Sequence, residues 1–534
     1  MIAQIWFALA MLVVVILARG VGGRIGVPFT ILLTLVGLAY ALVPGPKLEL
    51  DPEAVLVLVM PPLLYSTARR SSLLAIRANL RPIVSLSVLL VLATAFAVGA
   101  LVTLVVPGMP LAVGLVLGAA VAPPDPVAAL SIGRRAGMPP RLIVLIEGEG
   151  LLNDATALTT YQVAVAVAVG GAFSWTIASG LFLLAVAGGL AVGILVALLI
   201  RLARPMLRDP LIANAVSLAV PFVTYLVAEA IHSSGVLAVV VAGLMVGHNA
   251  GRTESGASRL QTGAVWEFVE YLLEGFVFLL IGQQLPSVIR GLQDQPLSIV
   301  VAAAAVSVGA VLLVRPLWLV ITQWLPARLH ARLGVRSTDR LRGRELVALS
   351  WAGTRGVITL VAVFAVPLTT EQGTPFPYRD LISFCAYVVV LVTLVGQGLT
   401  FAPLLRRLRL RINRAEVEQL RNQARLATID AGLARVDDLV AVDRIGPELA
   451  AAIRAGLAAR ADRYHARMAA LRESDDGQVT WTEDYEAAIA ARRAVINAQR
   501  EELLRWRDAG RLPDASLRIL RRELDHEERT LLDR

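Results

Sequence analysis

Long apolar runs recur along the first three quarters of the chain, and most of them are long enough to cross a lipid bilayer. A membrane-spanning helix needs about 20 predominantly apolar residues, because the hydrocarbon core is about 30 Å thick. Of the 534 residues, 57% are hydrophobic and only 17% are charged, whereas a soluble domain carries about 25% charged residues. The pattern therefore predicts an all-α, polytopic membrane protein.

Thirteen hydrophobic segments are expected to be transmembrane helices. The first is interpreted as a retained helix, because no basic residues precede it and no small-residue cleavage pattern follows it. The approximate ranges are 2–18, 28–44, 52–67, 82–106, 110–131, 141–169, 174–200, 210–231, 234–248, 263–285, 296–323, 345–368 and 379–405.

Basic residues are distributed very unevenly between alternate loops. With the N-terminus outside, the inside loops hold twenty basic residues and the outside loops three, namely Lys47, Arg290 and Arg379. Inside loops of membrane proteins are enriched in Lys and Arg, so this topology is favoured, with the chain in the cell membrane. The basic balance then reflects orientation and does not indicate nucleic-acid binding. The inside residues are Arg19, Arg24, Arg69, Arg70, Arg77, Arg81, Arg134, Arg135, Arg141, Arg201, Arg204, Arg208, Arg252, Arg259, Arg328, Arg332, Arg336, Arg340, Arg342 and Arg344.

The character of the chain changes at Arg406. The last 129 residues carry 25 of the 50 basic and 23 of the 41 acidic residues, without a run long enough to span. We therefore predict a membrane domain over 1–405 and a cytoplasmic helical tail over 406–534. Amphipathic helices are expected near 415–472, 484–508 and 513–532. The tail is either a solvated appendage or a regulatory or dimer contact.

The fifth hydrophobic segment contains the sequence APPDPVAA, residues 122–129. Pro123, Pro124 and Pro126 remove backbone donors and clash with the preceding turn, so the helix is expected to unwind around Asp125. Unwound backbone at membrane depth survives where it is buried in protein or lines a cavity, and it exposes carbonyls that can hold an ion. A proline kink without function is the alternative.

The sixth segment contains IEGEGLLNDATAL, residues 146–158. Glu149 and Asn153 are four residues apart and share a helix face, and Asp154 follows near the expected midplane. Ionisable residues at that depth are costly and mark ion or proton pathways. The Asp154 carboxylate can bind a proton or a cation, and competition between the two would couple their movements. A buried Asp satisfied by Asn and Thr side chains is the alternative.

The twelfth segment contains WAGTRGV, residues 351–357, in which glycines flank Arg355. A buried guanidinium needs a carboxylate or free carbonyls as partners, and we predict that Arg355 pairs with Glu149. The fifth and twelfth segments would correspond if segments 1–6 and 8–13 formed two inverted repeats. Crossed, interrupted helices in matching positions of such repeats mark transport sites.

These segments together resemble a known family. The chain is similar to bacterial Na+/H+ antiporters of the monovalent cation:proton antiporter family, relatives of animal sodium/proton exchangers, over all membrane segments and into the tail. The matching segments are MPPLLY at 60–65, PDPVAA at 124–129, GEGLLNDATAL at 148–158, AEAIHSSGVLAVVVAGL at 228–244, FVFLLIGQQL at 276–285 and WAGTRGV at 351–357.

The resemblance implies thirteen helices, a homodimer, and a core domain that moves against a dimerisation domain. It places transported Na+ at Asp154 and Asp125, with Asn153 and Pro124 shaping the site, and it implies electroneutral exchange because Asn153 cannot titrate. It also assigns Glu149 and Arg355 to a structural ion pair.

Two positions depart from the family pattern. Pro124 replaces a Thr and Gly150 replaces a Ser, and both changes remove a hydroxyl near the expected ion. A K+/H+ or broad monovalent selectivity is therefore an alternative to Na+(Li+)/H+ exchange.

Other charged residues fall within the predicted membrane segments. Glu267, Glu270 and Glu274 share a face of the tenth segment and could form an acidic funnel for cations or pair with inner-loop arginines. Arg315, beside Pro316, is expected to have a carboxylate partner that the sequence does not identify.

The expected function is secondary active antiport that contributes to pH homeostasis, without enzymatic activity or a cofactor, since no phosphate-binding loop is present. A non-transporting cation or pH sensor that signals through the tail is the rival from another class. A membrane-embedded hydrolase using Asp125 and Asp154 is disfavoured, because the single cysteine, Cys385, and the scattered histidines offer no metal-ligand spacing.

Overall fold

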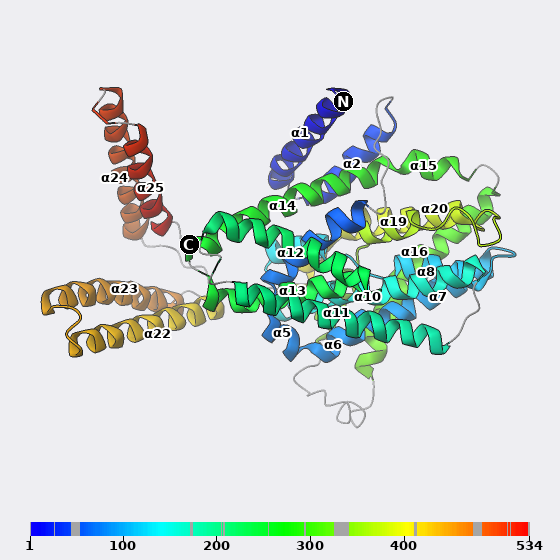
Figure 1. Cartoon of the computed structure of the whole chain (residues 1–534), viewed down its shortest axis with the longest axis horizontal. Helices are drawn as coiled ribbons and strands as arrows, with labels where there is room; N and C mark the ends of the chain where they lie inside the picture. The colour runs from blue at the N-terminus through cyan, green and yellow to red at the C-terminus, as the bar shows by residue number, and fades with distance from the viewer. Residues whose placement is uncertain are drawn as a thin grey trace. The chain divides into compact units, whose positions relative to one another are not determined.

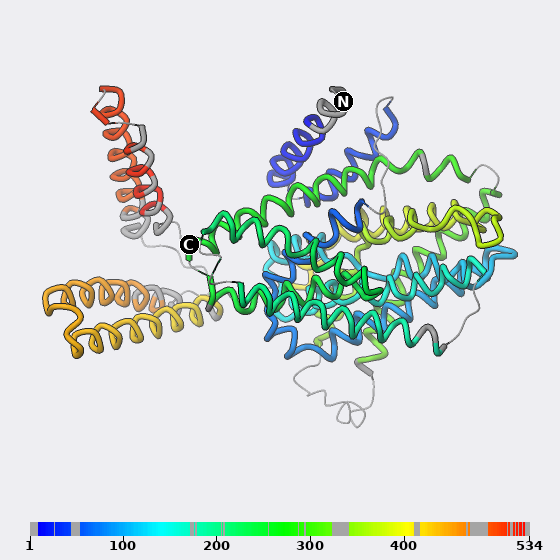
Figure 2. Tube along the Cα trace, viewed as in Figure 1, coloured from blue at the N-terminus to red at the C-terminus, as the bar shows by residue number. Residues whose placement is uncertain are grey.

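The fold is described from a computed structural model of the whole chain. It describes all residues except 1, 26, 44–53, 171–174, 204–205, 207–208, 255, 293–294, 325–340, 411–413, 474–482, 510, 513 and 532–534. Figure 2 traces the whole chain in the colours of the sequence bar, and these residues are among those drawn in grey. Of the basic residues that predicted the topology, those at 47, 204, 208 and between 328 and 340 lie outside the described residues.

Almost every described residue is helical or in a turn between helices, which confirms the all-α prediction. The chain divides into two compact units, Met1–Arg411 and Ile412–Arg534. The first unit contains α1 (Ile2–Ile25), α2 (Phe29–Ala41), η1 (Val55–Val59), α4 (Met60–Arg70), α5 (Leu73–Ala78), α6 (Leu80–Val84), η2 (Ser85–Leu89), α7 (Leu90–Val105), α8 (Leu111–Val121), α9 (Pro126–Ala136), α10 (Pro140–Val169), α11 (Trp175–Ala203), α12 (Pro210–Ala230), α13 (Gly235–Thr253), α14 (Gly256–Gln283), α15 (Leu285–Arg290), α16 (Leu297–Trp324), α18 (Gly343–Trp351), α19 (Val357–Phe364), α20 (Arg379–Leu391), η5 (Val392–Gln397) and α21 (Gly398–Leu408).

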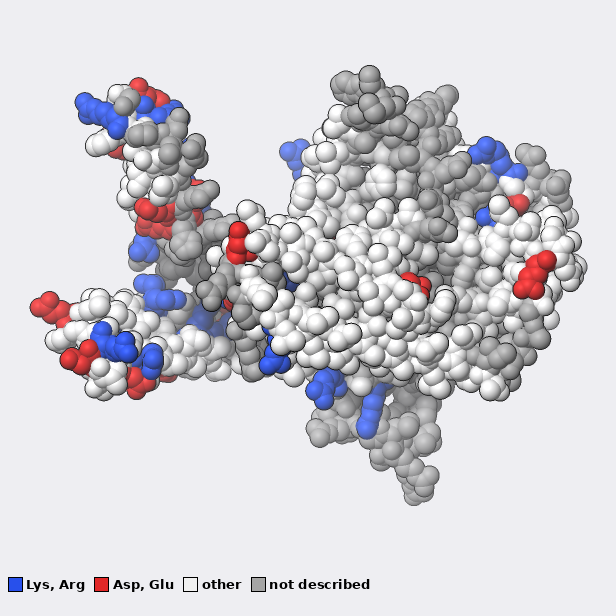
Figure 3. All heavy atoms as spheres, in the orientation of Figure 1, with Lys and Arg blue, Asp and Glu red and all other residues white. Residues whose placement is uncertain are grey.

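Each of the thirteen predicted hydrophobic segments coincides with a helix or with consecutive helices. Within the described residues, six stretches are long and apolar enough to cross a membrane by length and composition. Shorter apolar helices lie at Phe29–Ala41 and Gly235–Gly251. On the face drawn in Figure 3, most of the first unit's surface is uncharged, whereas basic and acidic side chains are interspersed on the tail helices. The first unit is thus a multi-helix membrane unit.

The helices of the first unit pack as two groups. Figure 1 shows part of the second group, with α7, α8, α16, α19 and α20 close together. The first helix group comprises α1, α2, α4, α11, α12, α13 and α14, and its members pack mainly on one another. The second helix group comprises α7, α8, α9, α10, α16, α18, α19, α20 and α21. Contacts between the groups are made chiefly by α10 against α11 and α13, and by α14 against α19. Both interrupted segments belong to the second group.

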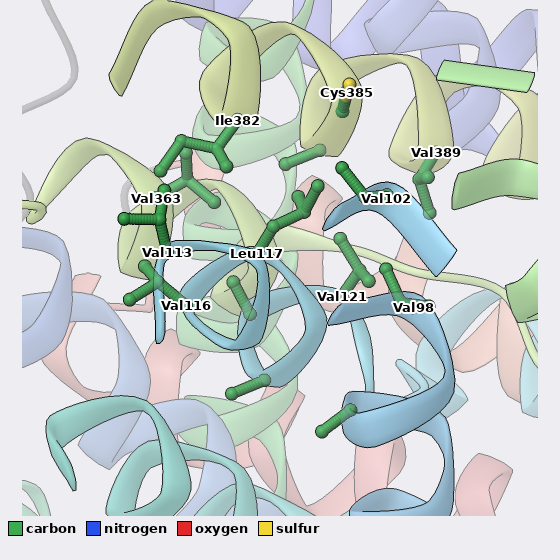
Figure 4. Packing of buried hydrophobic residues seen from close by; sticks show 14 of the residues in the cluster. Val98, Val102, Val113, Val116, Leu117, Val121, Val363, Ile382, Cys385 and Val389 are labelled. Carbon is green, nitrogen blue, oxygen red and sulfur yellow. The ribbon is translucent and has the colours of Figure 1, made fainter. Parts of the chain in front are cut away.

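Small residues permit close helix approach inside both groups, as is common where helices pack in membranes. In the first group, a Cβ added at Gly282 of α14 would lie 2.6 Å from the backbone N of Leu38 on α2. In the second group, aliphatic side chains of α7, α8, α19 and α20 pack against one another, and the fully buried Cys385 of α20 lies at the edge of the side chains drawn (Figure 4). Cys385 therefore serves as a packing residue.

The tail unit consists of two helical hairpins, α22 (Arg414–Ala441) with α23 (Pro447–Glu473) and α24 (Glu483–Asp508) with α25 (Asp514–Leu531). The expected single segment over 415–472 is therefore wrong, because the chain turns between α22 and α23. Asp443 adopts a left-handed conformation there, with φ of 54°, and Pro447 opens α23 at a position that tolerates its missing N–H. Cross-hairpin pairs are Arg454–Asp437 at 2.6 Å and Arg500–Glu528 at 2.6 Å.

Candidate functional site

Two interrupted helices meet at the centre of the second helix group. The first breaks between α8 and α9, at residues 122–125, and the second breaks between α18 and α19, at residues 352–356. The backbone N–H of Asp125 donates to the Thr354 carbonyl at 2.7 Å, and the Thr354 hydroxyl donates to the Asp125 carbonyl at 2.8 Å. Both predicted interruptions are confirmed, and this reciprocal pair of bonds joins them.

The Asp125 carboxylate lies at the N-termini of both downstream half-helices, α9 and α19. Its Oδ1 accepts from the Val127 N–H at 2.9 Å, which caps α9, and the carboxylate also lies against the Val357 N–H that opens α19. A helix N-terminus carries unsatisfied N–H groups and partial positive charge, so a carboxylate is stabilised there. Gly356 makes this approach possible, because a Cβ at that position would overlap the carboxylate of Asp125.

Two arginines donate hydrogen bonds to carbonyls at the C-termini of the upstream half-helices, α8 and α18. Arg355 donates from Nε to the carbonyl of Val121, the last residue of α8, at 2.6 Å, and also donates to the carbonyl of Gly353. Arg315 on α16 donates from Nε to the carbonyl of Leu349, in the last turn of α18, at 2.9 Å. Each guanidinium satisfies carbonyls that have no partner within their own helix, so the ends of both broken helices are neutralised.

Glu149 on α10 pairs with Arg315 and not with Arg355. Glu149 and Arg315 form a two-pronged ion pair, with Nη2 to Oε2 at 2.8 Å, and both side chains are at most 3% exposed. The predicted Glu149–Arg355 pair is therefore wrong. Arg355 satisfies its donors with the carbonyls that the two interruptions release, which leaves Glu149 for the other buried guanidinium.

Asn153 and Asp154 lie on α10 beside this crossing. Both are buried, at 0% and 2% exposure, and Asn153 Nδ2 donates to the Pro124 carbonyl at 2.8 Å. The Asn153 Oδ1 atom is buried and has no hydrogen-bond partner among the described residues. Asp154 and Asp125 lie within electrostatic range of each other. Four predicted site residues, Pro124 and Asp125 from the first interruption and Asn153 and Asp154 from α10, therefore gather at one place.

The three glutamates of α14 have different surroundings. Glu270 pairs with Arg70 of α4 at 2.5 Å, whereas exposed Glu267 lies 3.7 Å from Arg19 of α1. Glu274, one turn further along, lies within electrostatic range of both Glu270 and Asp125. Glu274 is therefore the glutamate that approaches the crossing. Glu267 and Glu270 pair with arginines, which is the predicted alternative to an acidic funnel.

Sequence reasoning missed Glu147 and Thr354. Glu147 of α10 pairs with Arg134 of α9 and accepts a bond of 3.3 Å from Ser71, which follows α4. Its position two residues before Glu149 was the available signal. Thr354 was overlooked because its role depends on the crossing partner, which lies more than two hundred residues away in the chain.

Comparison with known proteins identifies the family. A family model described as "Sodium/hydrogen exchanger, transmembrane" matches residues 9–407. The chain belongs to the sodium/hydrogen exchanger family. An uncharacterised Na+/H+ exchanger of Mycobacterium tuberculosis is 33% identical over 532 residues, which cover 98% of this chain and 95% of that protein. The predicted family is therefore confirmed.

Two further relatives are informative about sequence and fold. A protein of Bacillus subtilis named as a sodium, potassium, lithium and rubidium/H+ antiporter is 35% identical over 69% of this chain and 56% of its own length. The solved structure of a sodium proton antiporter from Methanocaldococcus jannaschii superposes with a TM-score of 0.61 at 19% identity, over 76% of this chain and 99% of that one. The structural match supports the same helical fold.

Proposed function

We propose that this family member exchanges Na+ or Li+ for H+ one for one, and that the two ions compete for the Asp154 carboxylate. The observation that carries the proposal is a pair of neighbouring carboxylates, buried Asp154 and half-buried Asp125, that have no basic partner. Glu149 is paired with Arg315, but no ion pair joins Asp154 or Asp125 to a basic side chain within the described residues. A buried carboxylate without a counter-charge requires a proton or a cation.

The buried charges support a one-for-one ratio. Arg315 and Arg355 carry two positive charges, because guanidinium groups remain protonated in proteins. Glu149, Asp125 and Asp154 carry three negative charges when ionised, so the empty site has one net negative charge. One Na+ or one H+ neutralises it, and only a neutralised site can cross a low-dielectric region at low cost. Asn153 adds no charge, which favours electroneutral exchange.

We infer that alternating access comes from an elevator-like or rocking movement of the second helix group against the first. The site residues all belong to the second group, and its internal packing is continuous around the crossing. A rigid body that carries the site past a separate scaffold would expose it alternately to the two sides.

Glu267, Glu270 and Glu274 are proposed to guide cations toward the site. Acidic side chains that line an approach raise the local cation concentration. Glu274 is the candidate for the inner end of this route, because it lies within electrostatic range of Asp125. Arg70 partly neutralises the charge of Glu270, and Arg19 partly neutralises that of Glu267.

We also propose the number of membrane spans, the oligomeric state and the orientation of the chain in the membrane. We expect thirteen spans in two inverted six-helix repeats, a homodimer in the cell membrane, the N-terminus outside and the tail of 406–534 in the cytoplasm. No cofactor is required, since the ions themselves are the substrates. Broad monovalent selectivity is the second candidate, because the Bacillus subtilis relative is named for sodium, potassium, lithium and rubidium.

Proteoliposomes with an imposed pH gradient test the proposal. Addition of Na+ or Li+ should collapse the gradient in wild type, without dependence on membrane potential. Asp154→Asn should abolish the response, because an amide binds neither a proton nor a cation tightly. Gly309→Ala is the matched control, because a Cβ at that position on α16 meets nothing within 4 Å.

The outcomes separate the hypotheses. Exchange that survives in Asp154→Asn would place the carrier elsewhere. A wild-type protein that responds to none of Li+, Na+, K+ and Rb+ would favour the sensor hypothesis. A flux that changes direction with membrane potential would contradict the one-for-one ratio.

A further inference from the structure

We propose that Thr393, in the last membrane segment, is a positioning residue for the cation site. Its hydroxyl holds the backbone of the second interruption in place, and that backbone in turn lies against Asp125. The inference rests on the proposed function, because it names a further residue on which cation binding at the same site depends. Thr393 acts through the backbone that it holds and is not assigned as a ligand of the cation.

The second interruption leaves backbone groups without helical partners. Residues 352–356 are not helical, so their buried N–H and C=O groups must bond elsewhere. The Thr354 carbonyl accepts from the backbone N–H of Asp125, and the Gly353 carbonyl accepts from the Arg355 guanidinium. The backbone N–H of Arg355 donates to Oγ1 of Thr393 at 2.9 Å. This last bond comes from a third element, since Thr393 lies in neither interrupted helix.

Thr393 is well suited to accept this bond. It belongs to η5, a stretch of π-helix that continues α20, and such stretches are rare and frequently lie at functional sites. The side chain is fully buried, and its hydroxyl donates to the Val389 carbonyl at 2.8 Å. Because the single hydroxyl proton is used there, the lone pairs of Oγ1 remain for the Arg355 N–H. The hydroxyl therefore links η5 to a backbone group 38 residues earlier in the chain.

The anchored residue, Arg355, lies between two residues that contact Asp125. Thr354 exchanges hydrogen bonds with the Asp125 backbone in both directions. Gly356 lies so close to the carboxylate that an added Cβ would be 2.6 Å from Cγ of Asp125. Movement of the Arg355 backbone therefore changes the position of both neighbours against Asp125, and the bond to Thr393 opposes that movement.

Loss of the Thr393 hydroxyl would leave a buried N–H without its acceptor. An unsatisfied buried donor is unfavourable, so the interruption should shift until the Arg355 N–H finds another partner. That shift displaces Gly356 and, with it, the carboxylate of Asp125. Cation affinity should then fall, whereas the movement of the second helix group does not depend on this bond.

The experiment compares Thr393→Val with Thr393→Ser in proteoliposomes. Valine keeps the branched shape of threonine but cannot accept the Arg355 N–H, whereas serine keeps the hydroxyl. The rate of pH-gradient collapse is measured over a series of Na+ concentrations, which gives the half-saturating concentration, KM, and the maximal rate.

Two further threonine-to-valine variants are matched controls. Thr400 of α21 accepts from Nε1 of Trp351 at 2.9 Å, so Thr400→Val removes a bond between the same two membrane segments but outside the interruption. Thr94 of α7 is buried, and its hydroxyl donates to the Leu90 carbonyl of its own helix at 2.7 Å. Thr94→Val therefore measures the effect of removing a buried hydroxyl elsewhere in the same helix group.

Thr393→Val should raise the KM for Na+ by about tenfold or more and keep the maximal rate within about threefold of wild type. Thr393→Ser and both controls should keep the KM and the maximal rate within about threefold of wild type. A purely structural role would lower the amount of folded protein, but it would not change the KM of the folded fraction.

A wild-type KM in Thr393→Val would overturn the inference. Equal rises in KM in the valine and serine variants, or in Thr393→Val and either control, would also overturn it, because the hydroxyl at this position would then not be the cause. If Thr393→Val does not fold, Thr393→Cys decides instead, since a thiol is only a weak acceptor: a KM above that of Thr393→Ser supports the inference, and an equal KM overturns it. Failure of wild type to exchange any cation would contradict the proposed function itself, which is a distinguishable result.

Discussion

At the scale of single residues, the buried arginines are the main correction to the sequence interpretation. Arg315 pairs with Glu149, and Arg355 bonds to the carbonyls of Val121 and Gly353. Gly353 lies between the two guanidinium groups, since a Cβ there would be 2.8 Å from Cδ of Arg315 and 3.3 Å from Nη1 of Arg355. The two arginines thus lie in one cluster but bond to different partners.

A double-mutant cycle tests this assignment. Removal of one partner from a buried ion pair leaves an uncompensated charge, at a cost of about 3–5 kcal/mol. Glu149→Gln and Arg315→Gln should therefore each lower the melting temperature strongly, and the combined variant should recover much of the loss. The coupling free energy between these positions should be about 2 kcal/mol or more.

The matched comparison is the cycle between Glu149 and Arg355. These side chains are not directly bonded, so we expect a coupling below about 1 kcal/mol, which reflects charge alone. Larger coupling of Glu149 to Arg355 than to Arg315 would contradict the observed pairing.

At the scale of elements, the crossing of the interrupted helices depends on complementary charges at the helix ends. Asp125 faces the N-termini of α9 and α19, and the two arginines face the C-termini of α8 and α18. Anions are favoured at N-termini and cations at C-termini. Each of the four helix ends at the crossing therefore faces a side chain whose charge is opposite to the partial charge of that end.

Gly356→Ala should disrupt this arrangement. The added Cβ would overlap Oδ2 of Asp125 and lie 2.6 Å from its Cγ, so the carboxylate must leave the N-terminus of α19. We expect at least about a tenfold loss of Na+-dependent proton flux, which corresponds to 1.4 kcal/mol or more. The flux is measured in proteoliposomes, with folding checked by gel filtration.

Gly396→Ala provides the control for that substitution, because a Cβ at position 396 meets nothing within 4 Å. It should retain the wild-type flux. Normal exchange in Gly356→Ala would show that the contact between Asp125 and α19 is not needed for transport.

At the scale of the whole molecule, the chain consists of two compact units, Met1–Arg411 and Ile412–Arg534. All the proposed site residues lie in the first unit. In the second unit, Ile429 and Val436 of α22 are buried in the first hairpin, and Ile496 of α24 is buried in the second.

A shortened protein that ends at Arg411 should therefore still fold and exchange ions. We expect its Na+-dependent proton flux to keep a maximal rate within about threefold of the full chain, because no proposed site residue is removed. The measurement is gradient collapse at matched protein density, repeated across a pH series. Complete loss of flux in a well-folded shortened protein would assign an essential role to the tail.

The sequence by itself determined the class of the protein and the location of its unusual features. Apolar runs of membrane length predict helices, because backbone groups in lipid must be satisfied within the segment. Prolines around Asp125 and glycines around Arg355 predict interruptions for reasons that act over a few residues. Asp154 and Asn153 could be singled out because polar groups at that depth are costly. These local causes are all readable along the chain.

Only the tertiary structure decided which residues form ion pairs and hydrogen bonds with one another. The carboxylate of Glu149 could have reached either guanidinium, and the choice of Arg315 depends on α16 lying beside α10 and α18. The bonds between Asp125 and Thr354 join segments that are remote in sequence. The contact of Pro126 with Gly150 likewise depends on how closely α9 approaches α10. Pairing and close approach are properties of packed helices, and no single helix carries them in its own sequence.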